Sequence, residues 1–148
     1  MYRMLIADDE MIERAVLYKM LSKNLEGQCE IYQAENGRQA LELYEKEKIQ
    51  IAVLDIEMPG INGIQAAEKI REKDKDCVIV FLTAFDEFSY AKRAIVIRAL
   101  DYLLKPCDEE ELTAVMEEAM RLTDKAVHNK ENPTGNGAEM TEAEKEAE

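Results

Sequence analysis

The sequence of 148 residues is poor in histidine, in paired cysteines and in long apolar runs, and each shortage excludes a class of protein. With His128 as its only histidine, a catalytic or metal site built on histidines is not expected. Cys29, Cys77 and Cys107 show neither a disulfide framework nor a CxxC metal motif, so we expect a reducing, cytoplasmic location. The longest uncharged apolar run, residues 77–85, is far shorter than the roughly 20 residues of a membrane helix.

Positive charge is also scarce. The chain carries 19 basic and 32 acidic residues, which give a formal net charge of −13, and no lysine or arginine cluster interrupts this balance. A surface of this kind repels phosphate backbones and anionic lipids, so we expect neither a nucleic acid nor a membrane as partner of this chain. The hydrophobic content of 47% fits one globular domain that buries a sizeable core.

Short β-rich runs alternate with longer amphipathic stretches along most of the chain, a pattern typical of an α/β fold with a parallel sheet and crossover helices. The expected strands are residues 3–7, 30–34, 51–54, 78–82 and 101–104. The expected helices are residues 11–25, 37–46, 63–73, 89–97 and 109–123. In the first helix we expect a buried stripe made of Met11, Ala15, Val16, Met20 and Leu21.

The apolar periodicity ends near Thr123. We therefore divide the chain into a domain at residues 1–123 and a polar, acidic tail or linker at residues 124–148, which contains Pro133, Gly135 and Gly137. A segment of this composition buries too little apolar surface to offset its ordering entropy, and we expect it to be disordered or partly helical.

Reactive side chains follow four of the five expected strands. Asp8 and Asp9 follow the first strand, Asp55 the third, Thr83 the fourth and Lys105 the fifth. The strand order 2-1-3-4-5 brings all of them to one edge of the sheet, where ligands of parallel α/β folds bind. Three carboxylates so close need a cation, and oxygen ligands favour Mg²⁺. With Lys105 as a fixed positive charge, the set suits phosphoryl transfer onto a carboxylate, with Asp55 as the nucleophile.

Each of these residues alone has a simpler explanation. An aspartate after a strand is usually a helix N-cap, a threonine there forms a turn, and a lysine is usually a solvated charge. Their joint occurrence at four strand ends favours a functional site.

Four sequence motifs resemble the receiver domain of bacterial two-component response regulators. They are ADDE at residues 7–10, LDIEMPG at 54–60, LTA at 82–84 and DYLLKP at 101–106. The resemblance implies a flavodoxin-like (βα)5 fold, a doubly wound parallel sheet in the order 2-1-3-4-5. It also implies a signalling switch in which Asp55 accepts a phosphoryl group from a sensor histidine kinase and controls an output, in this case transcription.

The same resemblance assigns the metal ligands. It implies that Asp9, Asp55 and the backbone carbonyl of Glu57 hold Mg²⁺, and that Asp8 does so directly or through a water molecule. The carboxylate of Glu57 is an additional acidic group beside the metal, within reach of Lys105 or of a water near the metal.

The resemblance also assigns the phosphoryl contacts and the switch. It implies that Thr83 and the backbone of Ala84 contact the phosphoryl group, that Lys105 pairs with it and that Tyr102 changes rotamer together with Thr83. The Lys105–Pro106 peptide bond is expected to be cis.

The segment FDEFSYAKRAI at residues 85–95 resembles receivers attached to AraC-type DNA-binding domains. Because Thr83 and Tyr102 lie between the site and the face formed by residues 89–97, 101–104 and 109–123, we expect that face to carry the signal, and a homodimer through it is a candidate. Arg98 departs from the family pattern because many receivers have glycine there. We therefore expect the loop at Arg98 to take a different shape.

Three other functions remain open from the sequence. An aspartyl-phosphate hydrolase of the haloacid dehalogenase type uses similar residues, but it has a second aspartate where this chain has Glu57. A flavin carrier needs a Ser/Thr/Gly-rich loop after the first strand, where this chain has ADDE. The site is alternatively vestigial, in a protein-interaction module. Our preferred interpretation is a switch that catalyses only its own phosphorylation and dephosphorylation.

Overall fold

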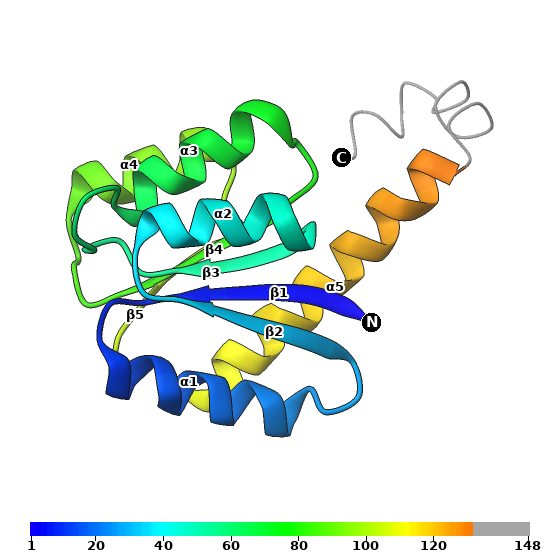
Figure 1. Ribbon diagram of the computed structural model, residues 1–148, viewed down its shortest axis with the longest axis horizontal. Coiled ribbons are helices and arrows are strands. Elements are labelled where there is room, and N and C mark those ends of the chain that lie inside the picture. The colour runs from blue at the N-terminus through cyan, green and yellow to red at the C-terminus, as the bar shows by residue number, and fades with distance from the viewer. Residues whose placement is uncertain (132–148) are drawn as a thin grey trace.

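Five parallel strands and five helices alternate in the computed structural model, which describes residues 1–131 (Figure 1). The strands are β1 (Tyr2–Ala7), β2 (Cys29–Ala34), β3 (Ile51–Leu54), β4 (Val78–Thr83) and β5 (Asp101–Leu104). The helices are α1 (Met11–Asn24), α2 (Gly37–Glu47), α3 (Gly63–Lys73), α4 (Phe88–Ile97) and α5 (Glu109–Glu131). The sheet order is β2-β1-β3-β4-β5, which confirms the flavodoxin-like prediction. Among the described residues no helix is both long and apolar enough to cross a membrane.

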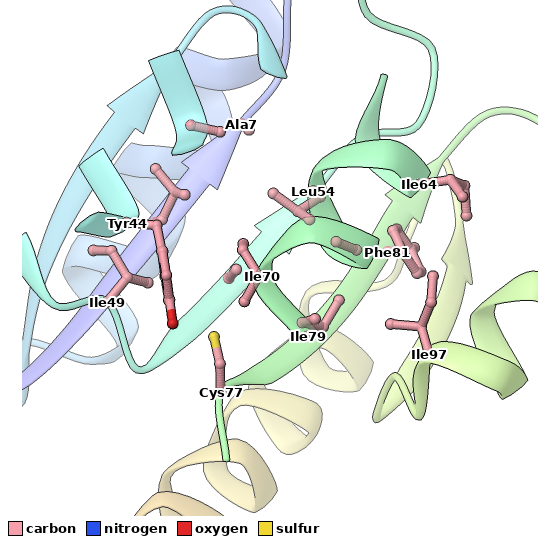
Figure 2. Packing of buried hydrophobic residues seen from close by; sticks show 14 of the residues in the cluster. Ala7, Tyr44, Ile49, Leu54, Ile64, Ile70, Cys77, Ile79, Phe81 and Ile97 are labelled. Atoms are coloured by element: carbon pink, nitrogen blue, oxygen red, sulfur yellow. The ribbon is translucent and has the colours of Figure 1, made fainter. Parts of the chain in front are cut away.

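The sheet separates two hydrophobic cores. Helices α1 and α5 cover one face, and α2, α3 and α4 cover the other (Figure 1). Successive residues of a strand point to opposite faces, so Met4 belongs to the first core and Leu5 to the second. Figure 2 shows the second core, where Phe81 and Ile70 pack close to Leu54 of the central strand. Strand β3 is buried throughout because both of its faces are covered.

Helix α1 buries a different stripe from the expected one. Leu17 and Leu21 face the sheet, whereas Met11 and Val16 are 70% and 58% exposed. Apolar residues lie all round this helix, so the spacing of three and four fits more than one stripe. Only packing against the sheet selects among them, and the expected stripe was wrong except for Leu21 and the half-buried Met20.

Helix α5 runs beyond Thr123 to Glu131. The hydroxyl of Tyr2 donates to both carboxylate oxygens of Asp124 at 2.8 Å, and Lys130 Nζ lies 3.6 Å from Asp76. These contacts extend the helix past the last buried turn, so its expected end was wrong. Residues 132–148, the rest of the expected tail, lie outside the described residues.

The loop between α4 and β5 keeps the left-handed shape although it has no glycine. Arg98 ends α4 with φ 65° and ψ 45°, so the expectation of another shape was wrong. Arg71 explains why this conformation persists. Its Nε donates to the carbonyl of Ile97 at 2.7 Å, and its Nη2 donates to that of Arg98 at 3.3 Å. These bonds satisfy carbonyl groups at the helix end and offset the strain, which is about 1 kcal/mol for a residue with a side chain.

Two glycines allow the loops near the carboxyl ends of the strands to pack closely. A Cβ atom on Gly63 would lie 2.0 Å from the carbonyl oxygen of Asp55, and one on Gly37 would lie 2.0 Å from that of Ile61. The amide of Gly63 also donates to the carbonyl of Ile56 at 2.8 Å. The start of α3 therefore presses directly against the backbone that carries Asp55.

Candidate functional site

Three carboxylates meet where β1 and β3 end. Ala7 of β1 is paired with Leu54 of β3, so the residues that follow, Asp8 and Asp55, are neighbours. Asp8 and Asp55 are buried and Asp9 is exposed, and one oxygen of each lies within 4.8 Å of the other two. A cluster of carboxylate oxygens open to solvent on one side is the donor set that Mg²⁺ prefers. These three residues fit a divalent cation.

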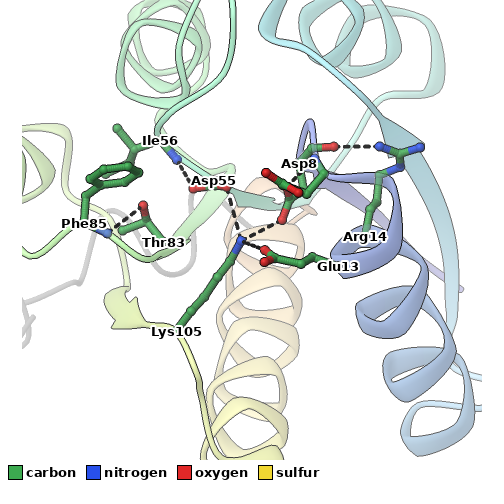
Figure 3. A network of polar contacts seen from close by, with 9 residues as sticks. Asp8, Glu13, Arg14, Asp55, Ile56, Thr83, Phe85 and Lys105 are labelled. Carbon is green, nitrogen blue, oxygen red and sulfur yellow. Dashed lines mark hydrogen bonds and ion pairs between the residues drawn. The ribbon is translucent and has the colours of Figure 1, made fainter.

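Lys105 enters this cluster from the end of β5. Its Nζ lies 2.8 Å from Asp8 Oδ2, 3.2 Å from Asp55 Oδ2 and 2.6 Å from Glu13 Oε1 (Figure 3). The amide of Lys105 donates to the carbonyl of Thr83 at 2.8 Å, and the Lys105–Pro106 peptide bond is cis, as expected. The turn after β5 thus directs the ammonium back over the edge of the sheet.

In both Asp55 and Lys105, burial and the opposite charges nearby shift the pKa in opposite directions. Burial raises the pKa of Asp55, with a smaller rise from Asp8, while the ammonium of Lys105 lowers it; the net shift is upward. Burial lowers the pKa of Lys105, but its hydrogen bonds to Asp8 and Glu13 raise it by more, so this pKa lies above its ordinary value. Lys105 therefore stays protonated, beside carboxylates that still repel one another.

Thr83 and Tyr102 are linked through the backbone of Phe85. The hydroxyl of Thr83, which is fully buried, accepts from the amide of Phe85 at 3.3 Å, and the hydroxyl of Tyr102 donates to its carbonyl at 2.5 Å. The ring of Tyr102 lies 6.2 Å from that of Phe81, between their centroids. Ala84, the residue between Thr83 and Phe85 in the chain, is exposed. Phe85 is a connection that the sequence interpretation did not include.

Glu57 points away from the lysine. Its carboxylate accepts from the hydroxyl of Tyr90 at 2.6 Å, so contact with Lys105, one of its two expected partners, is wrong. This hydrogen bond is the main cause that raises the pKa of Tyr90 to about 12. The assignment of the Glu57 backbone carbonyl to a metal stays a prediction.

Two residues of α1 belong to the site and were missed. Glu13 contacts Lys105, and Arg14 Nη1 donates to the carbonyl of Asp8 at 2.7 Å (Figure 3). Both lie in the first turns of a helix that begins directly after the acidic motif. Their position in the sequence could have indicated that they belong to the site, because the first turn of such a helix lies beside the end of the preceding strand.

The profile of the response regulator receiver domain family matches residues 4–117 of the chain. The chain belongs to this family. The receiver is 44% identical over 115 residues to the sensory transduction protein LytT of Oceanobacillus iheyensis, and the match covers 76% of the receiver and 45% of that protein. It is 33% identical over 131 residues to YesN of Bacillus subtilis, an uncharacterized transcriptional regulatory protein, and the match covers 88% of the receiver and 36% of YesN. The chain thus spans less than half the length of these curated relatives.

Solved structures agree with the fold. The receiver domain of AraT from Geobacillus stearothermophilus is 34% identical to this one, with a TM-score of 0.71 over 87% of this chain and 98% of that chain. A CheY-like receiver domain from Methanospirillum hungatei gives a TM-score of 0.78 at 22% identity, over 85% and 98% of the two chains, and shows the fold alone. Neither the structure nor these relatives favour the hydrolase, flavin-carrier or vestigial alternatives. The chain is a response regulator receiver domain of two-component signalling.

Proposed function

We propose that Asp55 is the residue of this receiver that takes a phosphoryl group from a sensor histidine kinase. The observation that carries this assignment is the place of Asp55 directly after the central strand, between Asp8, which follows β1, and Thr83 of β4, with Lys105 at 3.2 Å. Hydrogen bonding does not separate Asp8 from Asp55, since in each residue Oδ1 accepts from the amide of a following residue and Oδ2 contacts Lys105. Asp55 is preferred because it follows the central strand and has Thr83 of β4 on its other side.

The charge balance supports a divalent cation at this site. Asp8, Asp9, Asp55 and Glu13 bring four negative charges, and Lys105 and Arg14 bring two positive ones, so two negative charges are uncompensated. We assign Asp8, Asp9, Asp55 and the backbone carbonyl of Glu57 as the ligands of Mg²⁺. When bound, Mg²⁺ supplies positive charge that neutralises both the attacking carboxylate and the phosphoryl oxygens.

The transfer itself is a displacement at phosphorus. A carboxylate oxygen of Asp55 forms a bond to the phosphorus of phosphohistidine, and the P–N bond breaks with its electron pair left on the imidazole nitrogen. Asp55 becomes an acyl phosphate. The ammonium of Lys105 then pairs with one phosphoryl oxygen, and the hydroxyl of Thr83 and the amide of Ala84 donate to others. Attack of water on the same phosphorus breaks its bond to the Asp55 oxygen, releases inorganic phosphate and returns the aspartate. We propose that the domain catalyses only these two reactions.

The proposed output passes from Thr83 to the face formed by α4, β5 and α5. When the hydroxyl of Thr83 turns to the phosphoryl group it gives up the amide of Phe85, whose carbonyl holds Tyr102. Apolar side chains are exposed on or beside this face: Phe88 is 81%, Ile95 76%, Val96 73% and Leu104 41% exposed. A homodimer through this face would bury them.

The receiver is one part of a regulator in this proposal. The other part is an output domain that binds DNA and controls transcription, and residues 124–148 lead to it from the receiver. The domain boundary at residue 123 belongs to the same proposal. Binding of nucleic acid is not assigned to the acidic receiver. Three free cysteines agree with a cytoplasmic location.

Labelling with acetyl phosphate and Mg²⁺, followed by intact mass measurement, tests the proposed function. The parent chain should gain one phosphoryl group and Asp55→Asn should gain none. Asp108→Asn, which makes the same substitution at an exposed position before α5, is the control and should label like the parent. Equal labelling of Asp55→Asn and the parent would show that the acceptor is a different residue.

A further inference from the structure

Lys105 has a third acidic partner that the transfer described above does not use. Glu13 Oε1 lies 2.6 Å from Lys105 Nζ, closer than the oxygens of Asp8 at 2.8 Å and Asp55 at 3.2 Å. Glu13 approaches from the first turn of α1, on the side of the lysine away from Asp55 (Figure 3). The side chain of Glu13 is 52% exposed and that of Lys105 is 19% exposed, so the contact lies at the rim of the site.

The three partners of the ammonium differ in what a cation does to them. Asp8 and Asp55 belong to the group of carboxylates whose oxygens converge within 4.8 Å, and Glu13 does not. A divalent cation in that group attracts the oxygens of Asp8 and Asp55 and repels the ammonium. Glu13 is then the one contact of Lys105 that the cation leaves in place among the described residues.

We propose that Glu13 is a positioning residue, which holds the ammonium of Lys105 at the rim of the site while Asp8 and Asp55 are engaged by the cation. This inference rests on the proposed function. A lysine side chain has four rotatable carbon–carbon bonds and loses its orientation when its partners are withdrawn. With Glu13 as a fixed partner, the ammonium keeps one N–H in the pair and presents the other two to the arriving phosphoryl oxygens.

Three variants test the role of Glu13 at saturating Mg²⁺. Glu13→Gln keeps the size of the side chain and removes its charge, Glu13→Asp keeps the charge on a shorter side chain, and Glu26→Gln makes the same charge change at an exposed position after α1. Phosphorylation by phosphoramidate should slow by about two- to fivefold in Glu13→Gln, the range of one half-exposed ion pair. Glu13→Asp should recover part of the rate, and Glu26→Gln should match the parent.

Two further measurements separate positioning from a general structural effect. The affinity for beryllofluoride, an inert analogue of the phosphoryl group, should fall in Glu13→Gln by a factor similar to the fall in rate. In a double-mutant cycle, Glu13→Gln should add no further loss once Lys105 is alanine, because its effect passes through the lysine.

The positioning role is wrong if Glu13→Gln labels at the parental rate, or if it slows the Lys105→Ala chain as much as the parent. A faster rate in Glu13→Gln also contradicts it, because Glu13 would then compete with the phosphoryl group for the lysine. Failure of the proposed function is a separate result, since the parent itself would then carry no label on Asp55.

Discussion

The two ends of the sheet treat polar groups in different ways. At the amino ends of the strands, Tyr44 donates to Asp74 at 2.8 Å, and Arg3 Nη1 lies 3.7 Å from the carboxylate of Glu47. These groups form separate pairs. At the carboxyl ends, the carboxylates of Asp8, Asp55 and Glu13 share the ammonium of Lys105, the carboxylate of Asp9 lies beside them, and the charges do not balance. The polar groups named at the amino end are therefore paired, whereas the carboxyl end has excess negative charge that a bound cation would stabilise.

The largest effect is expected where the chain packs against the acceptor. Gly63→Ala should lower the free energy of unfolding by about 3 kcal/mol, because its Cβ would lie 2.0 Å from the carbonyl oxygen of Asp55. Gly27→Ala, at the opposite end of the sheet, is the control. Gly27 has φ 79° and open space around it, so its substitution should cost only about 1 kcal/mol. Urea denaturation measures both, and equal losses would contradict the close approach.

Mg²⁺ should stabilise the chain through the unbalanced end. At a concentration ten times its dissociation constant, the cation should raise the free energy of unfolding by about 1.4 kcal/mol. Asp55→Asn should reduce this gain because it removes one of the three converging carboxylates. Denaturation with and without Mg²⁺ provides the measurement, and an undiminished gain in Asp55→Asn would place the cation elsewhere.

Tyr44→Phe tests the amino end of the strands, where the polar groups are paired. Tyr44 is buried, and the variant removes its hydroxyl together with the hydrogen bond to Asp74, which should cost about 1 kcal/mol of stability. Labelling by acetyl phosphate should be unchanged, because the pair belongs to the end of the sheet without the site. A large loss of labelling in a folded Tyr44→Phe chain would mean that the two ends are coupled.

The smallest effect concerns Glu57 at the edge of the site. The pKa of Tyr90 is raised to about 12, mainly by its hydrogen bond to Glu57, so this contact supports the folded state below pH 10 and is lost as the pH rises through about 12. Glu57→Gln should bring the pKa of Tyr90 back towards 10. Phenolate absorbance during an alkaline titration measures it, with Tyr90→Phe to identify the signal. An unchanged titration in Glu57→Gln would exclude the carboxylate as the cause.

The sequence was sufficient for those features that depend on strand ends. Parallel strands end at one edge, so the strand order alone predicts that Asp8, Asp55 and Lys105 lie together, and their contacts confirm it. Features that depend on rotation about a helix axis were not accessible in the same way. The buried side of α1 and the contact of Glu13 with Lys105 both require the phase of the helix, which packing determines.

Two other differences arose from contacts distant in sequence. Helix α5 continues past Thr123, where Tyr2 binds Asp124, although these residues stand at opposite ends of the domain. Arg98 keeps a left-handed conformation because Arg71 of α3 satisfies its carbonyl. The residues that make these contacts lie far away in the sequence, so periodicity and residue type near residues 98 and 124 could not predict them.

The assignment of Asp55 as the phosphoacceptor is tested most directly by locating the phosphoryl group on a peptide. Trypsin is expected to release residues 49–69, and Asp55 is the only aspartate in that peptide. After incubation with acetyl phosphate and Mg²⁺, mass spectrometry should find one phosphoryl group on this peptide in the parent and none in Asp55→Asn. A phosphoryl group on any other peptide, at a level that Asp55→Asn does not change, would contradict the assignment.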